Sequence, residues 1–358
     1  MHRRYPLLVA LTLLAVAIGA WDGLRVMHNS GLPFAVTAAG TRAVRVEPLR
    51  DIGLPPGLQA GETIDLRTQP FATRAAILAS LTEGSVRPGE HLALHVERGG
   101  RPAAIAFTTR RLGAVPELRL ASWLGVLWAA LICLTALITL WRGKDWGAWG
   151  ISLWAIAFEA GLALTLAPAA GAGIVAVGVA SPFLYLIARV GFYLMAESIA
   201  APALTARTRR VLRAAFAVLL LAGMGYEIAA PLSLVFHALL VPQLIATVWA
   251  LPYLLATAML LLGYRRADAR HRQRLHWTFW SSLVFVVGIQ FSNVPLLGYP
   301  LSFVVEIGAY AVSMTGLLNV KMPRPMLRPP MRVAANTVKR PAPTKTAVTL
   351  ATLLAPSA

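Results

Sequence analysis

Long apolar runs, separated by short polar or basic stretches, form the main pattern along the chain. A helix that crosses the hydrocarbon core of a bilayer needs about 20 mostly apolar residues. The runs therefore predict an α-helical polytopic membrane protein with about eight transmembrane helices. These helices are expected near residues 6–20, 121–141, 149–167, 174–196, 212–230, 238–262, 278–297 and 300–320.

The first apolar run differs from the others in its length and flanks. It is short, it follows Arg3 and Arg4, and it ends with the small residues Gly19 and Ala20. These features are typical of a cleaved signal peptide and also of an uncleaved signal anchor over residues 1–24. Both alternatives predict that the segment after it is exported.

Positive charge alternates from one interhelical loop to the next. The loops around 168–173, 231–237 and 296–299 hold no Lys or Arg. The other short loops are basic, and basic loops face the cytoplasm. This predicts a multi-pass protein of a bacterial inner (plasma) membrane with residues 25–119 extracytoplasmic and the C-terminus cytoplasmic. The basic loop residues are Arg142, Lys144, Arg207, Arg209, Arg210, Arg213, Arg265, Arg266, Arg270, Arg272 and Arg274.

The exported segment 25–119 has the pattern of a small α+β domain. Residues 41–47 and 91–97 alternate between apolar and polar positions, which predicts half-buried strands. A glycine turn at 98–101 precedes a returning strand at 103–109, and residues 73–81 are expected to be helical. The predicted core consists of Val44, Val46, Leu58, Ile64, Leu66, Ile77, Leu81, Leu92, Leu94, Val96, Ile105 and Phe107.

Two short motifs in this segment resemble those of PDZ domains. Gly31-Leu32-Pro33-Phe34 is similar to the Gly-Leu-Gly-Phe loop of that family, and residues 57–64 are similar to its Gly-Leu-x-x-Gly-Asp-x-Ile turn, with Glu62 in place of Asp. The resemblance implies a PDZ-like domain that binds a peptide or protein ligand. Pro33 has no N–H, which argues against capture of a terminal carboxylate by this loop. The implied ligand-binding residues are Gly31, Leu32, Phe34, Arg74 and Ile77.

The membrane part, residues 120–320, resembles the sensor portion of multi-pass bacterial sensor histidine kinases. The resemblance rests on the segment 270–277, with the sequence Arg-His-Arg-Gln-Arg-Leu-His-Trp, and on Pro300-Leu301-Ser302-Phe303 before the last expected helix. Residues 321–358 are basic, rich in proline and without His, Asp or Glu, so they predict a disordered cytoplasmic tail and no kinase domain. Two interpretations stay open: a stand-alone sensor, or a truncated or frameshifted longer receptor.

Composition narrows the possible functions. Apolar residues make up 57% of the chain and charged residues 13%, yet the formal net charge is +18. Because the excess lies in short loops beside predicted membrane spans, it indicates orientation and contact with membrane lipids, and no nucleic-acid partner is expected. Cys133 is the only cysteine, and there is no His-Glu-x-x-His motif. No metal, no cofactor and no catalytic activity are therefore expected.

Ionisable and polar residues at membrane depth are the remaining site candidates, since burying such groups in lipid costs several kcal/mol unless they are satisfied. Glu159 and Arg189 lie on helices joined by a short loop, so they could form an ion pair; alternatively, the arginine reaches toward the interface. A second set could line an outward-facing polar cavity or simply lie close to the headgroups. That set is Glu227, Gln290, Asn293 and Glu306.

The resemblances and the topology together predict a membrane signal-reception module. The exported domain would bind a peptide or small ligand, and the helices would relay binding to a separate or missing cytoplasmic transmitter. A transporter or lipid-handling permease is one alternative, and a non-signalling envelope scaffold is another. A homodimer is also compatible with the sequence, which names neither the ligand nor the partner.

Overall fold

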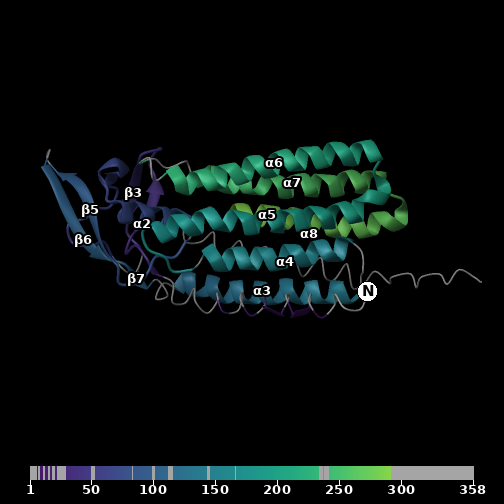
Figure 1. Cartoon of the computed structure of the whole chain (residues 1–358), viewed down its shortest axis with the longest axis horizontal. Coiled ribbons are helices and arrows are strands. Elements are labelled where there is room, and N and C mark those ends of the chain that lie inside the picture. The colour runs from purple at the N-terminus through teal and green to yellow at the C-terminus, as the bar shows by residue number, and fades with distance from the viewer. Residues whose placement is uncertain are drawn as a thin grey trace, which may run out of the picture. The chain divides into compact units, whose positions relative to one another are not determined.

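The computed structural model describes most of the chain between residues 30 and 291. The described ranges are 30–49, 53–82, 84–98, 101–111, 116–142, 146–165, 167–233 and 242–291, together with His237 and a few isolated positions before residue 30. Most of these residues are helical, and a small region of strands precedes the long helices (Figure 1).

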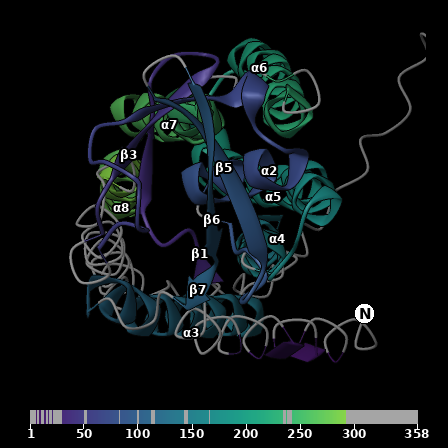
Figure 2. The same cartoon turned by 90° about the vertical axis from the view of Figure 1, so that its left-hand side faces the viewer.

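The described strand region contains three small antiparallel sheets. Strand β1 (Ser30–Gly31) pairs with β7 (Arg110–Arg111), and β2 (Ala35–Ala38), β3 (Ala43–Glu47) and β4 (Thr63–Asp65) form a sheet in the order β2-β3-β4. Strands β5 (His91–Arg98) and β6 (Arg101–Thr108) form a long hairpin. A short 3-10 helix, Leu66–Thr68, leads into helix α2 (Phe71–Leu81), which lies beside β5 in Figure 2.

The sequence pattern correctly predicted four of these elements, β3, α2, β5 and β6, within about two residues. Strand β3 falls within the expected 41–47, the β5–β6 hairpin has the expected turn with Arg98 opposite Arg101, and α2 covers 73–81. The apolar positions of β3 and β5 are buried and the intervening ones are mostly exposed. Phe34 and Phe107 meet edge to face in the resulting core, with ring centroids 5.3 Å apart.

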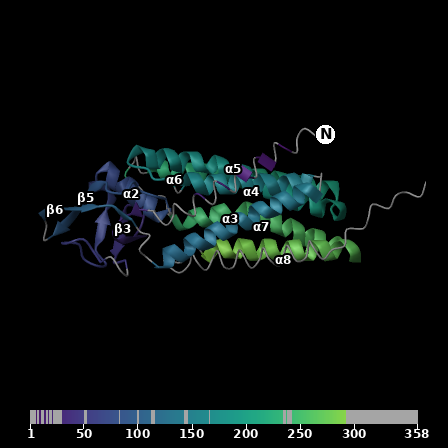
Figure 3. The same cartoon turned by 90° about the horizontal axis from the view of Figure 1, so that it is seen from below.

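Within the described residues, six long helices follow the strand region and run alongside one another (Figures 1 and 3). A short 3-10 helix, Ala201–Ala203, connects the third to the fourth. The six are α3 (Pro116–Arg142), α4 (Trp146–Thr165), α5 (Ala172–Ala200), α6 (Ala206–Ser233), α7 (Pro242–Arg266) and α8 (Ala269–Phe291).

Four segments within the described residues are long and apolar enough to span a membrane, fewer than the eight that the apolar runs predict. They are Trp146–Thr165, Ala172–Ala203, Ala206–Ser233 and Val248–Arg266. Helices α3 and α8 lie at two further predicted spans but are not among these four. The predicted spans 6–20 and 300–320 lie outside the continuously described residues.

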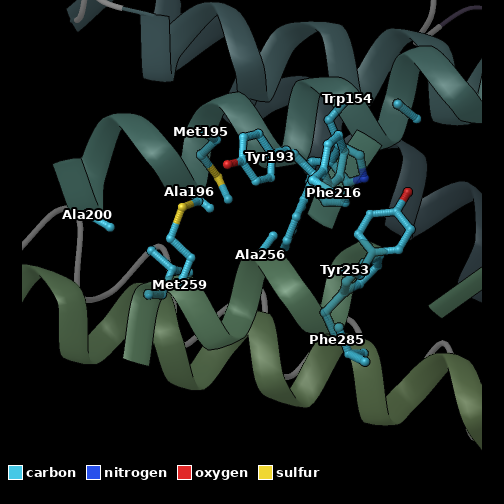
Figure 4. Packing of buried hydrophobic residues seen from close by; sticks show 14 of the residues in the cluster. Trp154, Tyr193, Met195, Ala196, Ala200, Phe216, Tyr253, Ala256, Met259 and Phe285 are labelled. Carbon is cyan, nitrogen blue, oxygen red and sulfur yellow. The ribbon is translucent and has the colours of Figure 1, made fainter. Parts of the chain in front are cut away.

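Small residues let α4 and α5 approach closely. A Cβ added to Gly150 would lie 2.5 Å from the carbonyl oxygen of Gly191, and one added to Gly191 would lie 2.5 Å from the backbone nitrogen of Trp154. Beside these glycines, Trp154 of α4 packs edge to face against Phe192 of α5 and against Phe285 of α8, and Tyr253 of α7 also contacts the Phe285 ring (Figure 4). Backbone contact at the glycines and aromatic packing beside them fix these helices against each other.

Candidate functional site

An ion pair between α5 and α6 is the most deeply buried charged feature in the described residues. Both terminal nitrogens of Arg189 donate to the two carboxylate oxygens of Glu227, one of them at 3.2 Å. Arg189 is 1% exposed and Glu227 is 7% exposed. The bidentate geometry explains how a guanidinium is tolerated in an apolar bundle, because an unpaired charge there would be very costly.

Aromatic side chains of α7 enclose this pair. The guanidinium carbon of Arg189 lies 5.4 Å from the ring centroid of Trp249, within the range of a cation–π contact. The Trp249 ring in turn lies 5.0 Å from that of the fully buried Tyr253. The ion pair thus connects three helices, with α5 supplying the cation, α6 the anion and α7 the aromatic wall.

Further hydrogen-bond donors lie beside the pair. In the described part of the chain, Arg189 Nε, Trp154 Nε1 and Tyr253 Oη are buried and make no hydrogen bond. The Tyr253 hydroxyl and the Trp154 indole lie near each other in Figure 4.

The structure changes the expected partner of Arg189. The guanidinium binds the carboxylate of Glu227, whereas the sequence left open either an ion pair with Glu159 on the preceding helix or an arginine that reaches toward the interface. Glu159 is buried on α4, 1% exposed. Gln290 lies in α8, and Asn293 and Glu306 lie outside the described residues, so the predicted outward-facing cavity stays a prediction.

The five residues that the PDZ resemblance implied are brought together in the strand region. Gly31 ends β1, and Leu32 and Phe34 precede β2, while Arg74 and Ile77 lie on α2. Leu32, Phe34 and Ile77 belong to one buried apolar cluster and therefore stabilise the fold. Ligand binding by these five residues stays a prediction.

Arg74 has a structural contact in this region. One of its terminal nitrogens donates to the carbonyl oxygen of Gln69 at 2.6 Å, and burial lowers the pKa of its guanidinium. The Gln69 side chain also bonds to the backbone of His95 in both directions, at 2.7 and 2.8 Å. Arg74 therefore helps to hold the start of α2 against β5.

The outer edge of β2 has no strand partner within the described residues. Ala39 donates to Ala43, whereas Val46 on β3 bonds to residues 61 and 62 on its other side. Hydrogen bonds alternate along antiparallel strands, so Val36 and Ala38 direct their backbone N–H and C=O away from β3. Within the described residues β2 pairs only with β3, and α2 packs beside it.

Backbone hydrogen bonds join the strand region to the connection between α4 and α5. Arg87 donates to the carbonyl of Ala169 at 2.8 Å, and Ala169 donates to that of Ser85 at 3.2 Å, which makes a parallel bridge at Val86. Ala169 lies in the α4–α5 connection, where Gly171 adopts a positive φ of 48°. Ile174, in the first turn of α5, is buried in the apolar cluster of the strand region.

Sequence reasoning missed this junction, although its residues carry a weak signal. The connection 168–173 is uncharged, and the glycines in it indicate a tight turn. Nothing in its composition identifies Ala169 as a strand partner, because an isolated bridge is set by the backbone and leaves no side-chain pattern.

Comparison with known proteins does not assign the chain to a family. No protein family model matches the sequence, and no curated protein and no solved structure matches it significantly. The case for a function therefore rests on the geometry described above.

Proposed function

We propose that the protein is a membrane signal-reception module of the bacterial inner membrane. Its strand region, a PDZ-like domain outside the cytoplasm, binds an extended peptide, and α5 relays that event inward. The observation that carries the proposal is that a single helix, α5, reaches from the strand region to the buried ion pair. In its first turn this helix contributes Ile174 to the core of the strand region, and near its middle it bears Arg189 of the buried ion pair.

The outer end of the module supplies an edge for the peptide. Val36 and Ala38 offer backbone donors and acceptors along β2, as strand addition requires. Pro33 removes one N–H from the preceding loop, so the preferred ligand is an internal extended segment instead of a free C-terminus.

The inner end of α5 is held by three other helices. Glu197 forms a salt bridge with Arg213 of α6 at 2.6 Å, and the His271 ring of α8 hydrogen-bonds the carbonyl of Ile199 at 2.8 Å. Gly263 of α7 lies against Ala200. At 1.5 Å per residue, the 29 residues of α5 extend about 43 Å, enough to cross a bilayer.

A relay of this kind needs a receiver. We place the basic α5–α6 and α7–α8 connections in the cytoplasm, where a separate transmitter protein would read their arrangement. We also propose that the protein has eight membrane spans and a cytoplasmic C-terminus. The similarity of residues 270–277 to sensor kinases supports this direction.

Peptide binding is tested with the full chain in lipid nanodiscs and a phage library that displays internal random peptides. Ala38→Pro removes a backbone N–H from the free edge of β2 without removing a bond to β3, and Ala38→Val keeps that N–H. Peptides selected on the wild type should bind the valine variant and lose at least tenfold affinity for the proline variant. Equal binding to both, or no enrichment of any peptide, would contradict the proposal.

A scaffold that binds the peptide without relaying the event would show the same binding. A second measurement is therefore needed at the inner end of α5. A fluorophore is attached to Ala203→Cys, because Cys133 is fully buried. Peptide addition should change the emission of the label if α5 relays binding. Binding without any change at residue 203 would favour the scaffold.

A further inference from the structure

The basic segments of the helices meet at one end of the bundle. Helices α6 and α7 pack against each other and follow in sequence, so the start of α6 lies at the same end as the close of α7. Helix α8 begins there too, since only two residues separate it from α7. The contacts of Glu197 with Arg213 and of His271 with Ile199 place the end of α5 among them.

Positive charge at this end greatly exceeds negative charge. Glu197 already binds Arg213, and the Asp268 carboxylate accepts the backbone N–H of His271 at 2.8 Å. Among the residues whose side chains are described, these two carboxylates face seven arginines. The seven are Arg207, Arg209, Arg210, Arg213, Arg265, Arg266 and Arg272.

An exposed apolar stripe continues from the arginines along α6. Positions 207, 211, 214, 218 and 221 recur every three or four residues, so they share one face of the helix. All five are exposed, with Val218 at 66% and Leu221 at 68%. The face therefore begins with Arg207 and becomes apolar within one turn, and Arg210 lies beside it.

We propose that this face of α6 binds an anionic phospholipid. Arg207 and Arg210 hold the phosphate beside the N-terminal end of α6, where the helix dipole also favours an anion. The acyl chain lies along Val211, Val218 and Leu221. A second copy of the chain fits the stripe poorly, because a symmetric contact would bring two sets of arginines together, and a free phosphate would leave the stripe uncovered.

The test compares lipids on the full chain in a mild detergent, with bound lipid counted by native mass spectrometry. Phosphatidylglycerol should bind more tightly than phosphatidylcholine, and inorganic phosphate should not compete for the site. The double variant Arg207→Gln/Arg210→Gln should bind phosphatidylglycerol about 30-fold more weakly, which corresponds to about 1 kcal/mol for each arginine. The matched control Arg110→Gln/Arg111→Gln changes two exposed arginines of β7 and should leave binding unchanged.

Three results would overturn the lipid site. Equal affinity for the two lipids would remove the role of charge, and an unaffected double variant would place the phosphate elsewhere. Competition by inorganic phosphate would show that the stripe contributes nothing. Oxidation of the variant Val218→Cys tests whether a second copy of the chain covers this face. A covalent dimer would show that it does, whereas the lipid site predicts a monomer. Cys133 is buried and should not form the cross-link.

Discussion

Arg189 shows at the residue scale how one side chain can define the interior of a helix bundle. It is among the largest fully buried side chains of the described residues, and its charge is compensated by Glu227 and by the face of Trp249. A buried ion pair need not add stability relative to apolar residues, but loss of one partner is costly. The pair therefore specifies how α5 and α6 fit together more than it stabilises them.

Removal of the anion alone should be strongly destabilising. Glu227→Gln leaves Arg189 charged and buried, so we expect a loss of about 3–5 kcal/mol. The measurement is thermal unfolding of the full chain in detergent. Arg189→Leu/Glu227→Leu should recover most of the loss, because no charge is then buried. The control Glu197→Gln, whose partner Arg213 is largely exposed, should cost less than about 1 kcal/mol; equal losses would contradict the special role of the buried pair.

Asp65 gives a pH-dependent prediction in the strand region. The hydrogen bond from the Arg67 side chain, with Nη2 at 2.6 Å, lowers the pKa of this carboxyl. A lowered pKa in the folded state gives stability that is present at neutral pH and is lost as the pH falls through that pKa.

Arg67→Gln should lower stability at neutral pH and make the acid-induced loss smaller, because the Asp65 pKa returns toward its ordinary value and the folded and unfolded states then bind protons alike. Thermal unfolding at neutral pH and across an acidic pH series measures the difference. Arg45→Gln, an exposed change on β3, is the control and should leave the profile unchanged. Identical profiles for all three proteins would show that this pair does not contribute.

At the scale of the elements, backbone contact between α4 and α5 is the tightest packing in the bundle. Gly150 and Gly191 each leave no room for a Cβ, because backbone atoms of the opposite helix would lie 2.5 Å from it. The two helices are therefore in direct backbone contact, and their connection at Ala169 carries the bridge to the strand region.

Gly150→Ala should force these helices apart. The added methyl group would meet the carbonyl of Gly191 and the nitrogen of Met195, so we expect a loss of about 1–3 kcal/mol in thermal unfolding. Gly225→Ala on α6 meets no atom within 4 Å and should stabilise by up to about 1 kcal/mol through helix propensity. A neutral Gly150→Ala would show that the crossing is loose.

Sequence patterns predicted individual elements well and their contacts poorly. Apolar runs located α4 to α7 within several residues, and strict alternation located β3 and the β5–β6 hairpin, because both signals are local. The partner of Arg189 was missed because it depends on how α5 and α6 rotate about their axes. The bridge at Ala169 was missed because it uses backbone atoms alone.

For the whole molecule, the contacts form one physical connection. It runs from the edge of β2 through the core of the strand region to Ile174, along α5 to Arg189, and on to Glu197 and Ile199. Spatial continuity does not by itself establish coupling, which requires that a change at one end alter the other. The central claim is therefore that the state of the strand region sets the state of the inner end of α5.

Hydrogen–deuterium exchange of the full chain in nanodiscs tests that claim without a ligand. Ala169→Pro removes the N–H that bonds Ser85 and so weakens the bridge, whereas Ala169→Ser keeps the N–H. The account predicts faster exchange both at residues 85–87 and at the distant segment 199–205 in the proline variant, with the serine variant close to wild type. Faster exchange at 85–87 with unchanged exchange at 199–205 would contradict it.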